Sequence, residues 1–251
     1  MTFTYSMIAA TDTGNVRAAN EDSLRVIPSI NLAVIADGMG GHKAGDIASR
    51  MAVDSLCEHF QEQALVNDAL GTQGTMDVMA DAFSLANSQV YANSHQFSNY
   101  EGMGTTLISA SCQPDQIQFG HIGDSRAYRF CRGKIEQLSV DHTLATELSV
   151  DTPAWELPAY SHHVLRKALG IESSCSPDFF TVKPENDEIF LLCSDGLTGV
   201  LEDEEISTIL ALRSHQPEHC LETLIDACVD GGAPDNISVI LIYVTVNSSL
   251  V

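Results

Sequence analysis

The chain has 251 residues, and 12 Lys and Arg side chains against 34 Asp and Glu side chains give a formal net charge of −22 at pH 7. This acidity argues against nucleic acid and an acidic membrane surface as partners, because affinity for both comes largely from Lys and Arg. Hydrophobic residues make up 44% of the chain, which is enough to form the core of one folded domain over residues 1–251.

The seven cysteines are widely spread, and no two of them form a Cys-x-x-Cys pair. Such usage is typical of a reduced protein rather than of a zinc site or a disulfide framework. The N-terminus lacks a basic start followed by an apolar stretch, and no window approaches the roughly 18 apolar residues that a membrane span needs. We therefore expect a cytoplasmic protein, and we take it to be a monomer.

The first hundred residues are predicted to form two strands followed by two helices. Residues 3–10 and 31–36 are apolar runs of strand length. Apolar positions then recur at helical spacing over 44–60 and again over 76–95.

From residue 105 onward the pattern is mainly that of strands. Four short ones are predicted, at 105–112, 117–122, 126–131 and 135–138, with connectors too short for a helical crossover, so neighbours should pair antiparallel. Residues 142–170 contain two prolines and show little periodicity, and we expect an irregular or partly helical segment there. The remaining elements are predicted as a strand at 188–194, helices at 202–212 and 217–229, and a strand at 237–246. This succession favours an α+β fold built on antiparallel sheets.

Four aspartates stand at the ends of apolar runs: Asp37, Asp124, Asp195 and Asp235. Each of them, taken alone, is also a common turn residue. If several of these strand ends meet, however, the repulsion among their carboxylates requires cations between them. Ligand sets made of oxygen alone favour Mg²⁺ or Mn²⁺ over zinc.

A cation precedes two adjacent acids near the N-terminus, in the segment Arg17-Ala-Ala-Asn20-Glu21-Asp22. The segment can be a solvated loop with a weak local ion pair. Alternatively, the planar guanidinium of Arg17 can bind two oxygens of a phosphate beside a metal cluster.

These segments belong to a longer ordered series of motifs: Arg17-x-x-Asn20-Glu21-Asp22, Ala36-Asp37-Gly38-Met-Gly-Gly-His42, Gly102-Met-Gly-Thr105-Thr106, Gly123-Asp124-Ser125-Arg126, Asp141-His142-Thr143, Ser194-Asp195-Gly196-Leu197 and Asp235-Asn236. The series resembles that of bacterial metal-dependent protein serine/threonine phosphatases of the PPM, or type 2C, family, from about residue 4 to residue 246. The resemblance implies a four-layer α-β-β-α sandwich of two antiparallel sheets flanked by helix pairs. It also implies that the segment at about 142–170 is a short flap beside the active site.

The resemblance further implies two Mn²⁺ or Mg²⁺ ions bridged by Asp37. The carbonyl of Gly38 would bind one ion, and Asp195 and Asp235 would bind the other. Glu21 and Asp22 would hold the second ion largely through water. A third, weaker ion would be held by Asp124 and Asp195, and Arg17 matches the arginine that binds the substrate phosphate.

The family's reaction is hydrolysis of phosphoserine and phosphothreonine on proteins, which opposes a Ser/Thr kinase. Two ions roughly 3.5 to 4 Å apart acidify a bridging water, and the resulting hydroxide attacks phosphorus in line. A proton donor assists the alkoxide leaving group. His42 is the candidate donor, although it can equally be a residue at a helix start that bonds the backbone.

Three other functions compete with this interpretation. The segment Gly123-Asp-Ser125 approaches the serine hydrolase motif, but the residues after Ser125 are predicted as a strand rather than the required helix. A cysteine-dependent phosphatase is excluded because no Cys is followed six positions later by Arg. A catalytically weak or silent family member that binds a phosphoprotein as a regulator is the remaining alternative, but such a protein is expected to have lost metal carboxylates.

Overall fold

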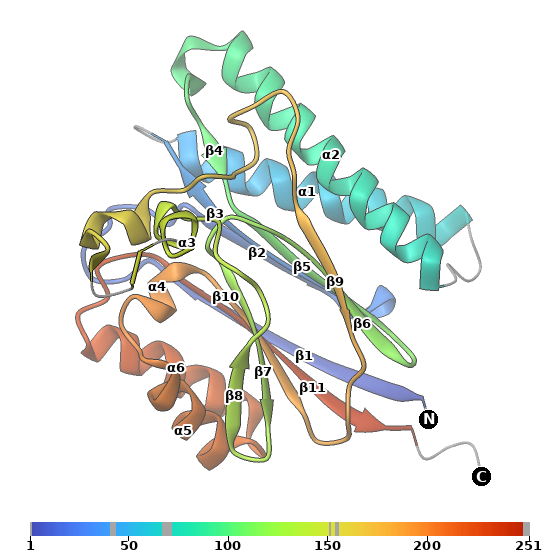
Figure 1. Cartoon of the computed structure of the whole chain (residues 1–251). Coiled ribbons are helices and arrows are strands. Elements are labelled where there is room, and N and C mark those ends of the chain that lie inside the picture. The colour runs from blue at the N-terminus through green and yellow to red at the C-terminus, as the bar shows by residue number, and fades with distance from the viewer. Residues whose placement is uncertain (1, 41–43, 67–71, 151, 154–155, 248–251) are drawn as a thin grey trace.

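The computed structural model of the chain describes residues 2–40, 44–66, 72–150, 152–153 and 156–247 (Figure 1). Two antiparallel sheets lie face to face between two helix pairs. The first sheet has the strand order β2-β3-β5-β6-β9, and β4 pairs with the end of β3. Its strands are β2 (Asp22–Ile27), β3 (Leu32–Met39), β4 (Gly104–Thr105), β5 (Leu107–Gln113), β6 (Gln116–Ile122) and β9 (Asp178–Val182).

The second sheet has the strand order β1-β11-β10-β7-β8. Its strands are β1 (Phe3–Asp12), β7 (Arg126–Cys131), β8 (Lys134–Gln137), β10 (Ile189–Cys193) and β11 (Ile237–Val246). The long first and last strands pair over their whole length, from Phe3 with Val246 to Asp12 with Ile237.

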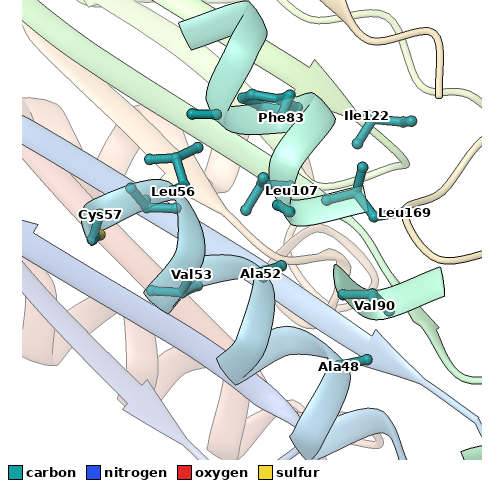
Figure 2. Close-up of a cluster of buried hydrophobic side chains, with 14 of the residues drawn as sticks. Ala48, Ala52, Val53, Leu56, Cys57, Phe83, Val90, Leu107, Ile122 and Leu169 are labelled. Atoms are coloured by element: carbon teal, nitrogen blue, oxygen red, sulfur yellow. The ribbon is translucent and has the colours of Figure 1, made fainter. Parts of the chain in front are cut away.

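Each sheet carries a helix pair on its outer face (Figure 1). The first pair is α1 (Ala44–Val66) and α2 (Thr72–Gln96), and the second is α5 (Asp203–Arg213) and α6 (Pro217–Asp230). Figure 2 shows part of the core under the first pair, where Leu56 of α1 and Phe83 of α2 lie close to Leu107 of the first sheet. A separate cluster that includes Phe119, Phe190 and Ile240 fills the space between the two sheets. The predicted α-β-β-α sandwich is therefore confirmed.

Two strands were not predicted from the sequence, β2 and β9. In the edge strand β9, two adjacent phenylalanines contact different layers: Phe179 packs edge-on against Phe83 of α2, while Phe180 stacks on Phe119 between the sheets. Because these apolar side chains are consecutive in the sequence, β9 lacks the alternation of apolar and polar residues that identifies a half-buried strand.

The predicted flap segment contains the short helix α3 (Leu144–Leu148) and a 3-10 turn at Ala159–His163. Its two ends are fastened by isolated bridges, Thr143 with Leu165 and Thr105 with Leu169. Trp155 lies outside the described residues. No helix in the described part of the chain is long and apolar enough to cross a membrane.

Candidate metal centre

A cavity of about 740 Å³ opens where the ends of both sheets meet the flap. It gathers residues that are far apart in the sequence. Seven of the residues that line it were predicted as site residues: Arg17, Glu21, Asp37, Gly38, Asp124, Asp195 and Asp235. Asp22 is buried beside them, and His42 lies outside the described residues.

Strand pairing in the first sheet brings two of the acids together. Asp22 opens β2 and is the direct cross-strand partner of Asp37 in β3. The prediction that β3 stops before Asp37 is wrong, because the strand continues to Met39 and pairs there with β4. The backbone at Asp37 is held by Thr106, whose Oγ1 accepts the Asp37 N–H at 2.9 Å and whose N–H donates to the Asp37 carbonyl at 2.9 Å.

Close backbone packing holds the Gly38 end of β3 against α1. A Cβ atom on Gly38 would lie 2.0 Å from the Gly45 carbonyl oxygen, so no larger residue fits without a shift of α1. This packing places the start of α1 beside the loop that carries Glu21, since Ser49 Oγ donates to the Glu21 carbonyl at 2.6 Å.

Two more acids of the cavity, Asp195 and Asp235, lie at the ends of adjacent strands of the second sheet. Asp195 follows β10 as the first residue of the short helix α4 (Asp195–Thr198), which was not predicted, and Asp235 precedes β11. A Cβ on Gly196 would lie 1.9 Å from the Asn236 carbonyl oxygen, so the two segments touch. Ser194 Oγ joins the sheets by donating to Asp22 Oδ2 at 2.8 Å and accepting the Ser238 N–H at 2.9 Å.

Five carboxyl groups in or beside the cavity, those of Glu21, Asp22, Asp37, Asp124 and Asp195, have raised pKa values, chiefly because they are buried. Burial raises the pKa of Asp22 to about 6 and that of Asp124 to about 7, and in both cases neighbouring carboxylates, including Asp195, add to the rise. The pKa of Asp37 lies well above its usual range, because of burial and then the charges of Asp22, Asp195, Asp124 and Asp235. Burial also raises the pKa of Asp195 and Glu21.

The donor set fits divalent cations. Asp22 Oδ1 and Asp195 Oδ1 are buried and have no hydrogen-bond partner, which is costly unless a ligand satisfies them. Elsewhere in the described part of the chain, three possible metal ligands lie within 4.8 Å of one another. They are Cys131, Glu185 and Glu188.

That other group is already neutralised by arginine. Arg129 bonds Glu188 and Arg132 bonds Glu185 at 3.0 Å.

Arg17 is in direct contact with one of the carboxylates that line the cavity. Its Nη2 lies 2.7 Å from Asp235 Oδ2, and half of its side chain is exposed. The predicted phosphate-binding group and a predicted metal ligand are therefore paired with each other.

Three basic residues of the flap also line the cavity, namely His163, Arg166 and Lys167. Neither Arg166 nor Lys167 was predicted as a site residue from the sequence. A signal was present, because these are the only adjacent Lys or Arg residues in a chain that has 12 of them. Arg166 bonds Glu147 of α3 at 2.6 Å, and Lys167 lies 3.4 Å from Asp178 of β9.

The serine hydrolase alternative is contradicted by the surroundings of Ser125. Its side chain is fully buried, its Oγ bonds Thr106 Oγ1 at 2.7 Å, and the chain continues into β7 instead of a helix. A nucleophilic serine needs an exposed hydroxyl at a strand-to-helix turn.

Comparison with known proteins gives one consistent result. The family model described as "Protein phosphatase 2C" matches residues 15–223. The chain is 33% identical over 239 residues to the serine/threonine phosphatase stp of Listeria welshimeri, covering 92% of this chain and 93% of the relative. The Staphylococcus aureus phosphatase Stp1 superimposes with a TM-score of 0.85 at 30% identity, covering 94% of each chain. The catalytic domain of the phosphatase PstP, solved in complex with two manganese ions, gives a TM-score of 0.84 at 30% identity and covers 97% of this chain and 100% of that one.

Proposed function

This chain belongs to the protein phosphatase 2C family and is a protein serine/threonine phosphatase, and we propose that it hydrolyses phosphoserine and phosphothreonine by metal-assisted attack of water on phosphorus. The observation that carries this mechanism is the convergence of Asp22, Asp37 and Asp195, with two orphaned buried oxygens, at one cavity. The structure of PstP in complex with two manganese ions supports Mn²⁺ as a cofactor. Mg²⁺ and a third ion remain part of the proposal.

The residues that would hold the ions are those around Asp37. Asp37 would bridge two of them, the Gly38 carbonyl would bind one, and Asp195 and Asp235 would bind the other. Glu21 and Asp22 would act through water, and Asp124 with Asp195 would hold a third ion. When bound, the ions supply a water activated for nucleophilic attack and offset the charge of the phosphoryl group.

The chain's own side chains bind and orient the substrate. Arg17 is exposed at the mouth and can give two N–H groups to phosphate oxygens, which fixes the phosphorus against the carboxylate cluster. Thr106 keeps the Asp37 backbone rigid by the two hydrogen bonds described above. His42 remains the predicted proton donor to the leaving oxygen.

The flap gives the cavity its selectivity for proteins. Arg166 and Lys167 add positive charge to a cavity that also holds several carboxylates, and together with His163 they would contact the phosphorylated segment of the substrate. We place the enzyme in the cytoplasm opposite a Ser/Thr kinase. The seven cysteines are free thiols, which suits a reducing compartment.

The alternative of a silent, phosphoprotein-binding member has less support. All the predicted metal carboxylates are retained, and those in the cavity keep the unfavourable burial that cations would relieve. A protein that only binds phosphoproteins has no physical reason to keep that cost.

The decisive experiment is hydrolysis of a phosphothreonine peptide and of p-nitrophenyl phosphate by protein stripped of metal. Activity should be absent in excess chelator and should return when Mn²⁺ or Mg²⁺ is added. Full activity in chelator would refute the mechanism, whereas Mn²⁺ binding with no turnover on either substrate would favour the silent regulator.

A further inference from the structure

His142 lies at the first residue of the flap and holds the turn that carries Asp124. The Gly123 N–H donates to His142 Nδ1 at 3.1 Å, and the His142 N–H donates to the Gly123 carbonyl at 2.8 Å. The imidazole is buried, with 7% of its side chain exposed. This ring therefore satisfies a buried backbone donor directly beside a predicted metal ligand.

The second ring nitrogen of His142 contacts a different element, β9. His142 Nε2 lies 3.2 Å from Asp178 Oδ2 at the start of β9. Because Nδ1 accepts a hydrogen bond, the proton of the neutral ring must be on Nε2, which donates to that carboxylate. Burial lowers the pKa of His142, which keeps the ring neutral at pH 7.

Asp178 extends the contact to the flap residue Lys167. Lys167 Nζ lies 3.4 Å from Asp178 Oδ1, and Lys167 lines the active cavity. The 3.5 Å between Lys167 Nζ and His142 Nε2 joins two donors, so the lysine is held by the carboxylate rather than by the ring.

The turn itself has little freedom to move. Gly123 has φ +108°, and a Cβ there would lie 2.6 Å from the Thr106 side chain. Thr106 in turn bonds the Asp37 N–H and Ser125 Oγ. The ring of His142 also packs on that of His121, with centroids 4.8 Å apart. A single rotamer of His142 thus meets the turn, β9 and the neighbouring strand at once.

We propose that His142 is a positioning residue that fixes the Asp124 turn through Nδ1 and the flap residue Lys167 through Nε2 and Asp178. This inference rests on the proposed function, since it concerns how the metal end and the substrate end of the same cavity are kept in register. Its two arms use different ring nitrogens, so they can be separated by substitution.

Asn and Gln each reproduce one ring nitrogen. In His142→Asn the side-chain oxygen can take the place of Nδ1 and accept the Gly123 N–H, but nothing reaches Asp178. In His142→Gln the amide can reach Asp178, but the Gly123 N–H loses its acceptor. His95→Asn, an exposed position on α2, is the matched control.

Three measurements follow: amide exchange at Gly123 by NMR, Mn²⁺ titration by calorimetry, and KM for a phosphothreonine peptide and for p-nitrophenyl phosphate. His142→Gln should speed exchange at Gly123 and weaken the weakest Mn²⁺ binding event about tenfold. His142→Asn should leave both unchanged and raise the peptide KM by about three- to tenfold, with the KM for p-nitrophenyl phosphate unaltered.

The proposal is overturned if both variants show the same changes, or if both behave like His95→Asn. Should His142→Gln fail to fold, Asp178→Asn, which is half-exposed, tests the flap arm and must raise the peptide KM without altering Mn²⁺ binding. Exchange and calorimetry need no turnover. If the wild-type protein has no phosphatase activity, the proposed function is refuted. Amide exchange and Mn²⁺ calorimetry then still test the role of His142.

Discussion

Asp22 and Asp37 stand side by side as cross-strand partners in β2 and β3, with 8% of Asp22 exposed. Like charges in this arrangement are destabilising, and burial makes them more so. The fold pays this cost at one place, where Asp195 and Asp124 add to the same field. A cluster of this kind is stable as a set of anions only when cations lie between its members.

The metal-free protein should be more stable in mild acid than in mild base. A carboxyl group whose pKa is raised on folding contributes stability below its unfolded pKa, and this contribution is lost as the pH rises through the folded value. For Asp22 and Asp124 that window runs from the usual value of 3.8 to about 6 and about 7, respectively. Thermal unfolding in chelator should give a higher Tm at pH 5 than at pH 8. The corresponding difference in the free energy of unfolding should be a few kcal/mol, on the order of the pKa shifts.

Mn²⁺ should reverse this trend, because it binds the deprotonated carboxylates. Its stabilising effect should grow from pH 5 to pH 8. A Tm in chelator that is flat over this range, or an Mn²⁺ effect independent of pH, would show that the carboxylates are not coupled as described.

Asp37→Asn should separate stability from activity. The amide keeps the shape of the side chain but removes one charge from the cluster, so the metal-free variant should unfold at a Tm several degrees above that of the wild type. The same change removes the proposed bridging ligand, and turnover should fall by at least about a hundredfold. Differential scanning calorimetry in chelator and a peptide assay in Mn²⁺ measure the two effects.

Asp54→Asn is the control, since Asp54 is an exposed acid of α1 paired with Arg25 outside the cavity. It should change neither quantity by much. An Asp37→Asn protein with a lowered metal-free Tm would contradict the repulsion, and one with normal turnover would reject Asp37 as a ligand.

Local signals in the sequence predicted an α+β fold on antiparallel sheets and the four aspartates at the ends of apolar runs, whereas the sandwich arrangement and the roles of Glu21 and Asp22 followed from the resemblance of the ordered motifs. Apolar runs that end at Asp195 or begin after Asp235 mark strands of the second sheet, and helical periodicity located both outer helix pairs within a few residues. Which acids would lie next to each other was harder to predict. That Asp22 faces Asp37 depends on β2, whose pairing register is set by tertiary contacts rather than by its own six residues.

Other features depend on contacts between distant segments. The pairing of Arg17 with Asp235 joins residues 218 positions apart. Lys167 reaches the cavity because the flap is fastened at Thr105 and Leu169, and no local pattern in residues 142–170 specifies that bridge.

Arg17→Ala should act mainly on substrate binding. The guanidinium is exposed at the cavity mouth, so its loss removes ground-state binding of the phosphate and should raise KM about tenfold with a smaller change in kcat. Arg17→Lys keeps the charge but cannot bind two oxygens at once, and it should recover part of the loss. Initial rates with a phosphothreonine peptide at saturating Mn²⁺ measure this, and an unchanged KM in both variants would remove Arg17 from substrate binding.

Asn236 fastens the loop that presents Arg17 and Glu21. Its Nδ2 donates to the carbonyls of Thr13 at 2.9 Å and Ala19 at 3.0 Å, and its Oδ1 accepts the Glu21 N–H at 2.8 Å. The side chain is buried, so Asn236→Ala leaves these groups without partners and should lower the free energy of unfolding by about 1 to 3 kcal/mol.

The loop should also lose its position in Asn236→Ala, which predicts a higher peptide KM and a higher Mn²⁺ concentration for half-maximal activity. Ile206→Val, at a buried core position of α5, is the matched control, since it should lower the free energy of unfolding by about 0.5 to 1.5 kcal/mol without touching the loop. Urea unfolding places the two variants on one stability scale. Because Asn236 acts through the loop, the peptide KM of Asn236→Ala should be raised even at temperatures where both variants are fully folded. Equal kinetics in Asn236→Ala and Ile206→Val would show that Asn236 contributes only to stability.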